Sequence, residues 1–167
     1  MKLSLKWMTS AAVICLLMSG CDQPAPEGTA YETQPAISEE IHTEEDEMIL
    51  ELMIEDTAVT VEWENNQSVD ALKKLCADQP LSISMSMYGG FEQVGPIGTK
   101  LPSNDVQTTT SYGDIVLYSS DQIVMFYGSN SWAYTRLGHV TDKTQEEMTK
   151  LLGNGDVTIT LRMGEEK

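Results

Sequence analysis

Aromatic and polar side chains that could bind a ligand are concentrated between residues 88 and 136. Aromatic rings supply contact area in binding sites, and an amide or a guanidinium group can orient a bound carboxylate or carbonyl. The set favours recognition of a ligand, and it suits a peptide as well as a small molecule. The candidate ligand-binding residues are Tyr88, Phe91, Phe126, Tyr127, Asn130, Trp132, Tyr134 and Arg136.

The same residues have a structural explanation. Phe126 and Tyr127 end an apolar run and could belong to the core. Trp132 could fold over the rim of the domain, and Arg136 could pair with an acid such as Asp114. Loss of binding with stability intact, after alanine substitution at Trp132, would distinguish a binding site from simple packing.

Residues for catalysis or metal binding form no recognisable pattern. His139 is the only histidine after residue 47, and no serine lies in the glycine-flanked elbow of a hydrolase. The second histidine, His42, lies among acidic residues far away in the sequence, so the two predict no metal site. We therefore predict no catalytic residues, no metal ligands and no cofactor.

The charge of the chain excludes some partners. The 167 residues carry a formal net charge of −16, and about half of this excess falls after residue 47. Nucleic-acid binding needs a basic surface, so we expect no nucleic acid as a partner. An acidic chain is also repelled by an anionic membrane surface unless a covalent anchor holds it there.

The N-terminus supplies a candidate anchor. Lys2 and Lys6 precede an apolar run, residues 11–18, that is too short to span a bilayer as a helix. The following Met18-Ser19-Gly20-Cys21 resembles a bacterial lipobox, although Met18 replaces the usual leucine. This resemblance implies a lipoprotein signal peptide over residues 1–20 and an acylated Cys21, for example with palmitate. An ordinary secretory signal is the alternative.

Residues 21–47 are rich in proline, glutamate and threonine and carry charge of one sign, which predicts an acidic disordered tether. The folded domain is then expected over residues 48–167. Cys15 would leave with the leader and Cys21 would be acylated, so Cys76 has no partner for an intramolecular disulfide. We expect Cys76 to be a small packed side chain.

Hydrophobic patterns in the domain predict a mainly β fold. Leu81, Ile83, Met85 and Met87 alternate with serines, as in a strand with one buried face. The connection 128–134 reads as an aromatic-rich loop. About eight strands are expected, at 48–54, 57–64, 81–87, 106–111, 115–118, 123–127, between 134 and 140, and 157–163.

Two short helices are expected between these strands. Ser68 is a candidate N-cap for the first helix, which ends before Pro80. Thr144 and Glu147 form a capping-box pattern for the second, which Gly153 ends. An antiparallel β-barrel would protect the strand edges, with the helices covering its two ends. Residues 88–92 could form a pocket wall or a turn at the barrel end.

The chain from about residue 49 to 163 resembles the cyclophilin-like domain of bacterial proteins, lipoproteins among them. The segments that carry the resemblance are 113–115, 126–132 and 134–140. The resemblance implies a cyclophilin-like antiparallel β-barrel of about eight strands with two short helices capping the ends. By order along the chain, Phe126 matches the aromatic strand of the cyclophilin groove, and Trp132 matches its tryptophan loop.

The resemblance is incomplete where catalysis is concerned. Cyclophilins twist the prolyl bond with a strand arginine assisted by phenylalanine and glutamine. The corresponding region, residues 81–98, contains no arginine; Gln93 lies outside a matching motif, and Arg136 lies on another strand. Since a neutral side chain cannot replace that electrophile, we disfavour the alternative of a peptidyl-prolyl cis-trans isomerase.

We therefore expect a membrane-anchored lipoprotein on the extracytoplasmic face of the cell membrane, held by lipidated Cys21. Its cyclophilin-like domain would be a binding module for an unknown peptide or small-molecule ligand. A docking surface for a partner protein is a third possibility.

Overall fold

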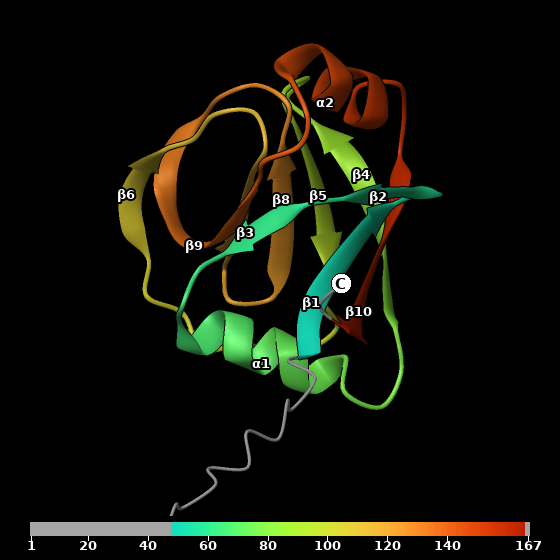
Figure 1. The fold of residues 1–167 in the computed structure, drawn as a ribbon. Coiled ribbons are helices and arrows are strands. Elements are labelled where there is room, and N and C mark those ends of the chain that lie inside the picture. Colours follow the sequence, from blue (N-terminus) through green and yellow to red (C-terminus); the bar gives the residue numbers. More distant parts are fainter. Residues whose placement is uncertain (1–47, 166–167) are drawn as a thin grey trace, which may run out of the picture. The chain divides into compact units, whose positions relative to one another are not determined.

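Ten strands and two helices make up residues 48–165, which are the residues that the computed structural model describes. The predicted signal peptide, Cys21 and the acidic tether lie outside the described residues. Figure 1 shows the arrangement of the elements. They are β1 (Met48–Ile54), β2 (Thr57–Val59), β3 (Val61–Trp63), α1 (Gln67–Leu75), β4 (Leu81–Tyr88), β5 (Glu92–Pro96), β6 (Val106–Thr109), β7 (Asp114–Tyr118), β8 (Gln122–Phe126), β9 (Ser131–Val140), α2 (Gln145–Leu152) and β10 (Val157–Glu165).

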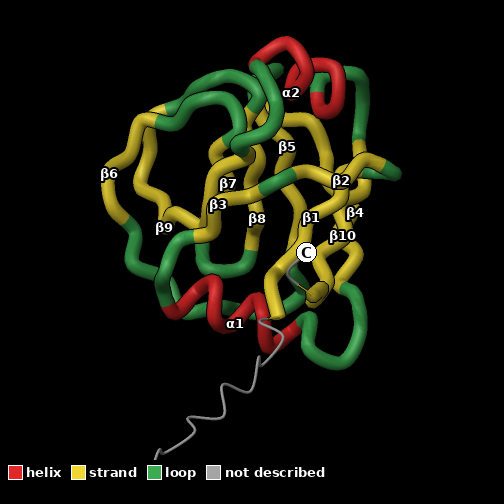
Figure 2. The backbone as a smooth tube through the Cα atoms, viewed as in Figure 1, coloured by secondary structure: helices red, strands yellow, loops and turns green. Residues whose placement is uncertain are grey.

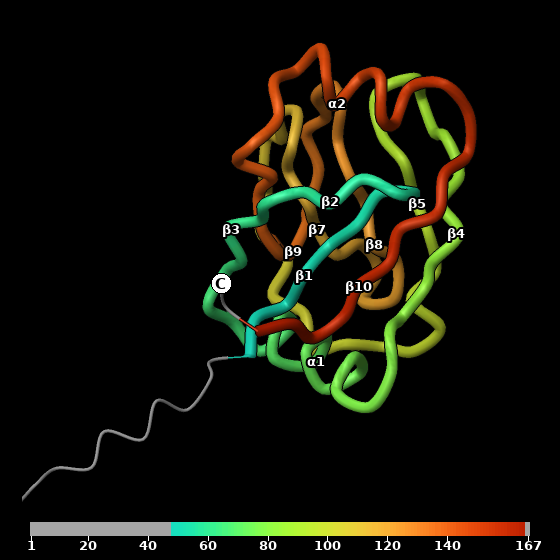
Figure 3. The backbone as a smooth tube through the Cα atoms, turned by 45° about the vertical axis from the view of Figure 1, so that its right-hand side comes forward, coloured from blue at the N-terminus to red at the C-terminus, as the bar shows by residue number. Residues whose placement is uncertain are grey.

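The strands form a nearly closed antiparallel barrel, which confirms the expected mainly β fold. Their order is β2-β1-β10-β4-β5-β8-β7-β9-β3, with β6 paired to β9. The two ends of this order, β2 and β3, are separated in sequence by Thr60 alone. We call residues 57–63 the closing segment, because they pair with β1 at one end and β9 at the other. Figure 3 shows this segment crossing the barrel wall.

A single continuous strand over 57–64 was expected, and the structure divides it at Thr60. The Thr60 amide donates a hydrogen bond to Asp142 Oδ1 at 2.9 Å, and its carbonyl accepts one from the Thr141 amide at 2.9 Å. These bonds to the segment after β9 replace pairing with β1. The backbone therefore changes its pairing partner at this residue.

The main core follows from the alternating strands. Ile83 and Met85 on β4 and Ile159 and Leu161 on β10 are buried, as their alternation predicts. Met87 was expected on the same buried face but is 41% exposed, because β4 there continues past the core to pair with β5.

The strands β7 and β8 are buried on both faces. A second apolar cluster, made of Val116, Val124, Phe126 and Tyr134, lies on the face opposite to the main core. Burial on both faces explains why these two strands read as continuous apolar runs and do not alternate.

The two helices lie at opposite ends of the barrel (Figure 2). The capping box of Thr144 and Glu147 at the start of α2 is confirmed, and Gly153 follows its last turn. The N-cap of α1 is Asn66 and not Ser68: the Asn66 Oδ1 atom accepts hydrogen bonds from the Ser68 and Val69 amides, both at 3.0 Å. Neither helix of residues 48–165 has the length and apolar character needed to cross a membrane.

Two differences from the expected strands raise their number from about eight to ten. The first is the division at Thr60, and the second is β5, which is absent from the expected strands. Strand β9 also begins at Ser131, inside the expected aromatic loop, because its first residues pair with β6. Figure 1 shows β6 and this part of β9 curving away from the other strands.

Gly95 lets β4 and β5 approach closely because it has no side chain. A substitution at this position therefore tests how tightly the barrel wall is packed. A Cβ at this position would lie 2.5 Å from Met85 Sδ, 2.7 Å from Ile83 Cγ2 and 2.8 Å from the Ser84 carbonyl oxygen. We expect Gly95→Ala to lower the free energy of unfolding by roughly 1–3 kcal/mol through overpacking. Urea denaturation measures this, with Ser84→Ala at an exposed position as the control. Equal stability of the two variants would contradict the prediction.

Candidate functional site

A groove of about 420 Å³ lies over the outer face of β5, β7 and β8. The strands β4 and β9 contribute its two sides, and the β8–β9 connection contributes Asn130. We call it the aromatic groove, because half of the side chains that line it are aromatic. The lining residues are Tyr88, Glu92, Val94, Tyr118, Val124, Asn130, Trp132 and Tyr134.

Strand register builds the floor of the groove. Residues that face each other on antiparallel strands share one face of the sheet. Val94 of β5 is opposite Val124 of β8, which in turn is opposite Val116 of β7. Glu92 is opposite Phe126 in the same register, so the carboxyl side chain emerges on the same apolar face.

A three-residue turn, Gly89-Gly90-Phe91, brings Tyr88 next to Glu92. Gly89 and Gly90 have φ angles of +63° and +76°, as the tight turns of β-hairpins require. Tyr88 and Glu92 are cross-strand partners on either side of this turn. Of the two possibilities for residues 88–92, the structure contains the turn, and the turn also places Tyr88 in the groove wall.

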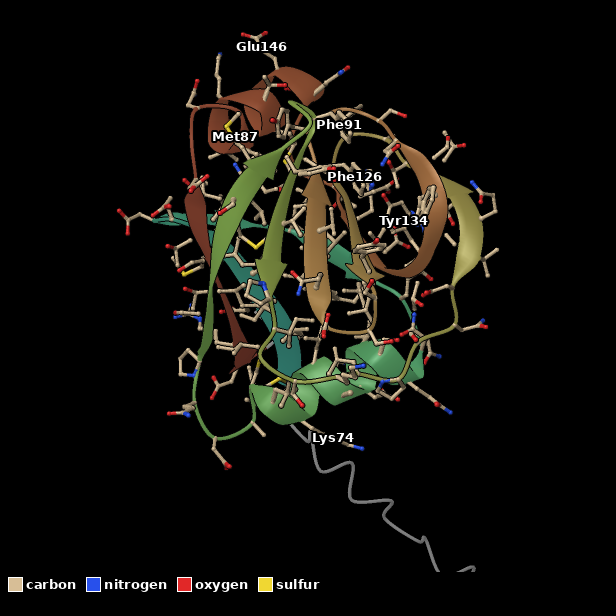
Figure 4. All side chains as sticks on the ribbon, turned by 180° about the vertical axis from the view of Figure 1, so that it is seen from behind. Lys74, Met87, Phe91, Phe126, Tyr134 and Glu146 are labelled. Carbon is tan, nitrogen blue, oxygen red and sulfur yellow. The ribbon has the colours of Figure 1, made fainter. Side chains whose placement is uncertain are left out.

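Tyr134 is held by three neighbours. Its hydroxyl accepts a hydrogen bond of 3.0 Å from Asn130 Nδ2. Its ring meets those of Phe126 and Tyr118 edge to face, with centroid distances of 5.8 Å and 6.1 Å. Figure 4 shows Phe91, Phe126 and Tyr134 near one another on the outer side of β5 and β8. These contacts fix one wall of the groove before any ligand arrives.

The groove contains a buried carboxyl oxygen that has no hydrogen-bond partner among the described residues. Glu92 is only 5% exposed, and its Oε2 atom finds no donor among residues 48–165. Burial raises the pKa of Glu92 to about 7. Burial and the charge of Glu92 also raise the pKa of Tyr134 and of Tyr127. A carboxyl in this state can accept a hydrogen bond from a ligand or exchange a proton near neutral pH.

The rim of the groove exposes two large aromatic side chains. Tyr88 on β4 is 66% exposed and Trp132 on β9 is 57% exposed. Exposed aromatic side chains next to a concave apolar surface are typical of ligand-binding sites.

The structure places four of the eight predicted ligand-binding residues in the aromatic groove and four outside it. Four of them line the aromatic groove: Tyr88, Asn130, Trp132 and Tyr134. Phe91 and Phe126 pack beneath it in the second apolar cluster, and Tyr127 belongs to the main core.

Arg136 lies outside the groove. Its Nη2 atom donates a 2.9 Å hydrogen bond to Asp114 Oδ1, and its Nε atom donates one of 3.3 Å to Glu64 Oε1. The ion pair with Asp114 that the sequence suggested is therefore present.

Asp114 collects several donors and has a structural role. Its carboxylate contacts Arg136 Nη2 and His139 Nδ1, both at 2.9 Å, and accepts a hydrogen bond from the Ser111 amide at 2.8 Å. Burial alone would raise the pKa of Asp114, but the hydrogen bonds from Ser111 and His139 and the charge of Arg136 outweigh it and lower the pKa. The cluster fixes the start of β7 against β9.

Gln93, next to Glu92 on β5, points to the opposite face. It is fully buried, and its Nε2 atom donates hydrogen bonds of 2.6 Å to the Leu152 carbonyl and 2.7 Å to the Gly155 carbonyl. Gln93 therefore ties β5 to the end of α2 and the turn that follows it.

Four lining residues were not predicted: Glu92, Val94, Tyr118 and Val124. Glu92 follows the two-glycine turn, where a glutamate normally faces solvent. The signal that could have found it is the strand register, once Glu92–Pro96 is recognised as a strand. Tyr118 ends β7 just before the Ser119-Ser120 turn, a position that also reads as exposed.

The other candidate sites offer fewer groups that could bind a ligand or react with one. A larger hollow of about 650 Å³ lies beside the start of α1, but Arg136, its one charged lining residue, is already paired with Asp114 and Glu64. Burial raises the pKa of the Cys76 thiol, which disfavours a reactive thiolate. Within the described part of the chain, no three His, Cys, Asp or Glu residues are grouped so as to hold a metal ion.

A model of the Cyclophilin-like family matches residues 52–162, which include every strand that lines the groove. No curated protein and no solved structure gives a significant match to the chain.

The buried carboxyl of Glu92 should make stability depend on pH. The folded chain holds this proton more tightly than the unfolded chain, whose glutamate pKa is near 4.5. The contribution of Glu92 is therefore fully present below that pKa and is lost as the pH rises through 7. We expect Glu92→Gln to reduce the loss of stability between about pH 5 and about pH 8 by roughly 1–3 kcal/mol.

Urea denaturation across this pH range measures the effect, and Glu62→Gln at an exposed position is the matched control. An unchanged pH dependence in Glu92→Gln would show that Glu92 is not the titrating group.

Proposed function

The chain belongs to the Cyclophilin-like family, and from this premise we propose that its barrel is a binding module for a peptide or a small molecule. The observation that carries the proposal is the aromatic groove, whose wall at Tyr134 is held by Asn130, Phe126 and Tyr118. A site that is ordered before binding loses less conformational entropy when its ligand arrives.

The residues of the groove support binding over prolyl isomerisation. None of the eight lining residues is an arginine, a lysine or a histidine. Isomerisation of a prolyl amide is helped by a hydrogen-bond donor or a cation placed beside the twisting amide. The aromatic groove contains no side chain with a permanent positive charge. The one arginine near this side of the barrel, Arg136, is engaged with Asp114 and Glu64.

The proposed setting is the extracytoplasmic face of the cell membrane, with Cys21 carrying the lipid. It is supported by the lipobox-like Met18-Ser19-Gly20-Cys21 and by the position of the first strand, which begins at Met48. The 26 residues between Cys21 and Met48 would separate the barrel from the lipid by roughly 25–30 Å if they behave as a flexible chain. That distance would leave the groove accessible to ligands.

The anchor has a direct test. We expect Cys21→Ser to prevent acylation and to move the protein from the membrane fraction to the soluble fraction of its host. Metabolic labelling with a palmitate analogue, followed by fractionation, measures both effects. A C76S variant is the matched control and should remain labelled, and label retained in the Cys21 variant would contradict the anchor.

Ligand binding is tested by thermal shift with the full-length chain, using proline-containing peptides beside a library of small metabolites. A ligand at a hundredfold excess over its dissociation constant stabilises the native state by about 2.7 kcal/mol. We expect Trp132→Ala to keep the melting midpoint of the free protein, because the side chain is 57% exposed, but to abolish the ligand-induced shift.

Two controls complete this test. Tyr112→Ala removes an exposed aromatic side chain outside the groove and should leave the shift unchanged. Phe126→Ala should lower stability by roughly 3–5 kcal/mol, because Phe126 is fully buried. A shift that survives in Trp132→Ala would place binding elsewhere, and no shift with any compound would favour the partner-docking alternative.

A further inference from the structure

We propose that the aromatic groove selects ligands that carry an organic ammonium group, held against the aromatic side chains with its charge balanced by Glu92. The inference rests on the proposed function, because it assigns a ligand chemistry to the same groove. A primary ammonium group, such as that of a lysine side chain, and a quaternary ammonium group share this positive charge, and only the primary group can also donate hydrogen bonds.

The charges in the groove favour a cation. Glu92 is the only acidic side chain among the eight lining residues, and none of them is basic. It is 5% exposed and its Oε2 atom finds no donor within residues 48–165. A buried carboxylate oxygen without a partner is costly. The positive charge of any ligand ammonium group would reduce this cost, and a primary ammonium group would also donate a hydrogen bond to the carboxylate.

The aromatic side chains favour an organic cation. Tyr88, Tyr118, Trp132 and Tyr134 line the groove, and the rings of Tyr118 and Tyr134 stand at 69° to each other. Two rings at a steep angle can contact a cation from two directions. Aromatic rings attract ammonium groups through their quadrupole, and several rings together form the cages that bind quaternary ammonium ligands.

A metal ion fits this site poorly. Calcium takes six to eight oxygen ligands, whereas the groove offers one carboxylate, an amide and phenolic oxygens. The Asn130 side-chain oxygen, the atom that a metal would use, already accepts a hydrogen bond of 2.8 Å from the Ser131 amide. The apolar Val94 and Val124 of the floor suit the methyl or methylene groups of an organic cation.

The net charge of the domain also favours a cationic ligand. Residues 48–167 contain eight basic and 17 acidic side chains, so the folded part of the chain is strongly negative. A surface of one sign raises the local concentration of ligands of the opposite sign.

The pKa of Glu92, which burial raises to about 7, gives the inference a pH signature. A proton and an ammonium group compete for this carboxylate, so affinity for the cation should rise with pH. The other titratable groups that face Glu92 are tyrosines: Tyr88 on β4, Tyr118 on β7, Tyr127 after β8 and Tyr134 on β9. Tyrosine ordinarily ionises near pH 10, so Glu92 dominates the change near neutrality.

The experiment is isothermal titration of the full-length chain with choline chloride and with 3,3-dimethyl-1-butanol, its neutral carbon isostere. A second pair of probes is a capped Gly-Lys-Gly peptide and the same peptide with an acetylated lysine. We expect one or both cations to bind and the neutral partners to bind at least about tenfold more weakly. Affinity for the cation should rise about tenfold between about pH 6 and about pH 8.

Glu92→Gln should remove this pH dependence and weaken cation binding at least about tenfold, whereas Glu62→Gln should change neither. If Glu92→Gln proves poorly folded, the pH dependence of the unmodified chain carries the same test. Binding by choline alone would assign small amines, and binding by the lysine peptide alone would assign peptides.

Equal binding of cationic and neutral probes, or affinity that falls as the pH rises, would overturn the inference. So would the absence of binding by both cations. If neutral compounds still stabilise the protein in the thermal-shift screen and Trp132→Ala abolishes that effect, the proposed function stands and only the ammonium assignment fails. If no compound of any kind binds, both fail.

Discussion

Closure of the barrel by residues 57–63 is the constraint on which the other features depend. The chain changes partners at Thr60, where hydrogen bonds to Asp142 and Thr141 replace those of the sheet. Because β3 then pairs with the second half of β9, that half is fixed between β3 and β7. The first half of β9 leaves the barrel wall, pairs with β6, and covers the outer face of β7 and β8.

This cover gives the domain two apolar regions on opposite faces of one sheet. The main core fills the barrel, and the second cluster lies under Tyr134. Strands buried on both sides are rigid, and the floor of the groove consists of such strands. The shape of the groove is therefore fixed by packing and by one hydrogen bond between Asn130 and Tyr134. The same packing leaves the Glu92 Oε2 atom without a hydrogen-bond donor among the described residues.

Features that depend on neighbouring residues were predictable from the sequence, and those that depend on distant contacts were not. The Thr144–Glu147 capping box and the alternation of β10 are local patterns and are confirmed. The choice of Asn66 over Ser68 as N-cap was not predictable, because both residues can cap a helix. Ser68 instead donates to the Pro102 carbonyl, 34 positions away in the sequence.

The candidate site shows the same division. Aromatic residues near turns pointed to Tyr88, Trp132 and Tyr134, but Glu92 was not among the predicted ligand-binding residues. Its burial results from β8 and from the cover provided by β9, both more than 25 residues away in the chain. Strand β5 was also missed, because glycine and proline are uncommon inside strands. The glycine at position 95 is explained only by the close approach of Met85 and Ile83, which the sequence does not show.

Adjacent positions on β5 give the domain a mechanical link between its two faces. Glu92 points into the groove, and Gln93 holds the carbonyl groups of Leu152 and Gly155 on the other side of the sheet. Since the two residues are adjacent in sequence, the hydrogen bonds of Gln93 to the end of α2 also restrain the backbone at Glu92. The end of α2 therefore supports the strand that carries Glu92, and a change at Leu152 or Gly155 would alter the groove without adding or removing a lining residue.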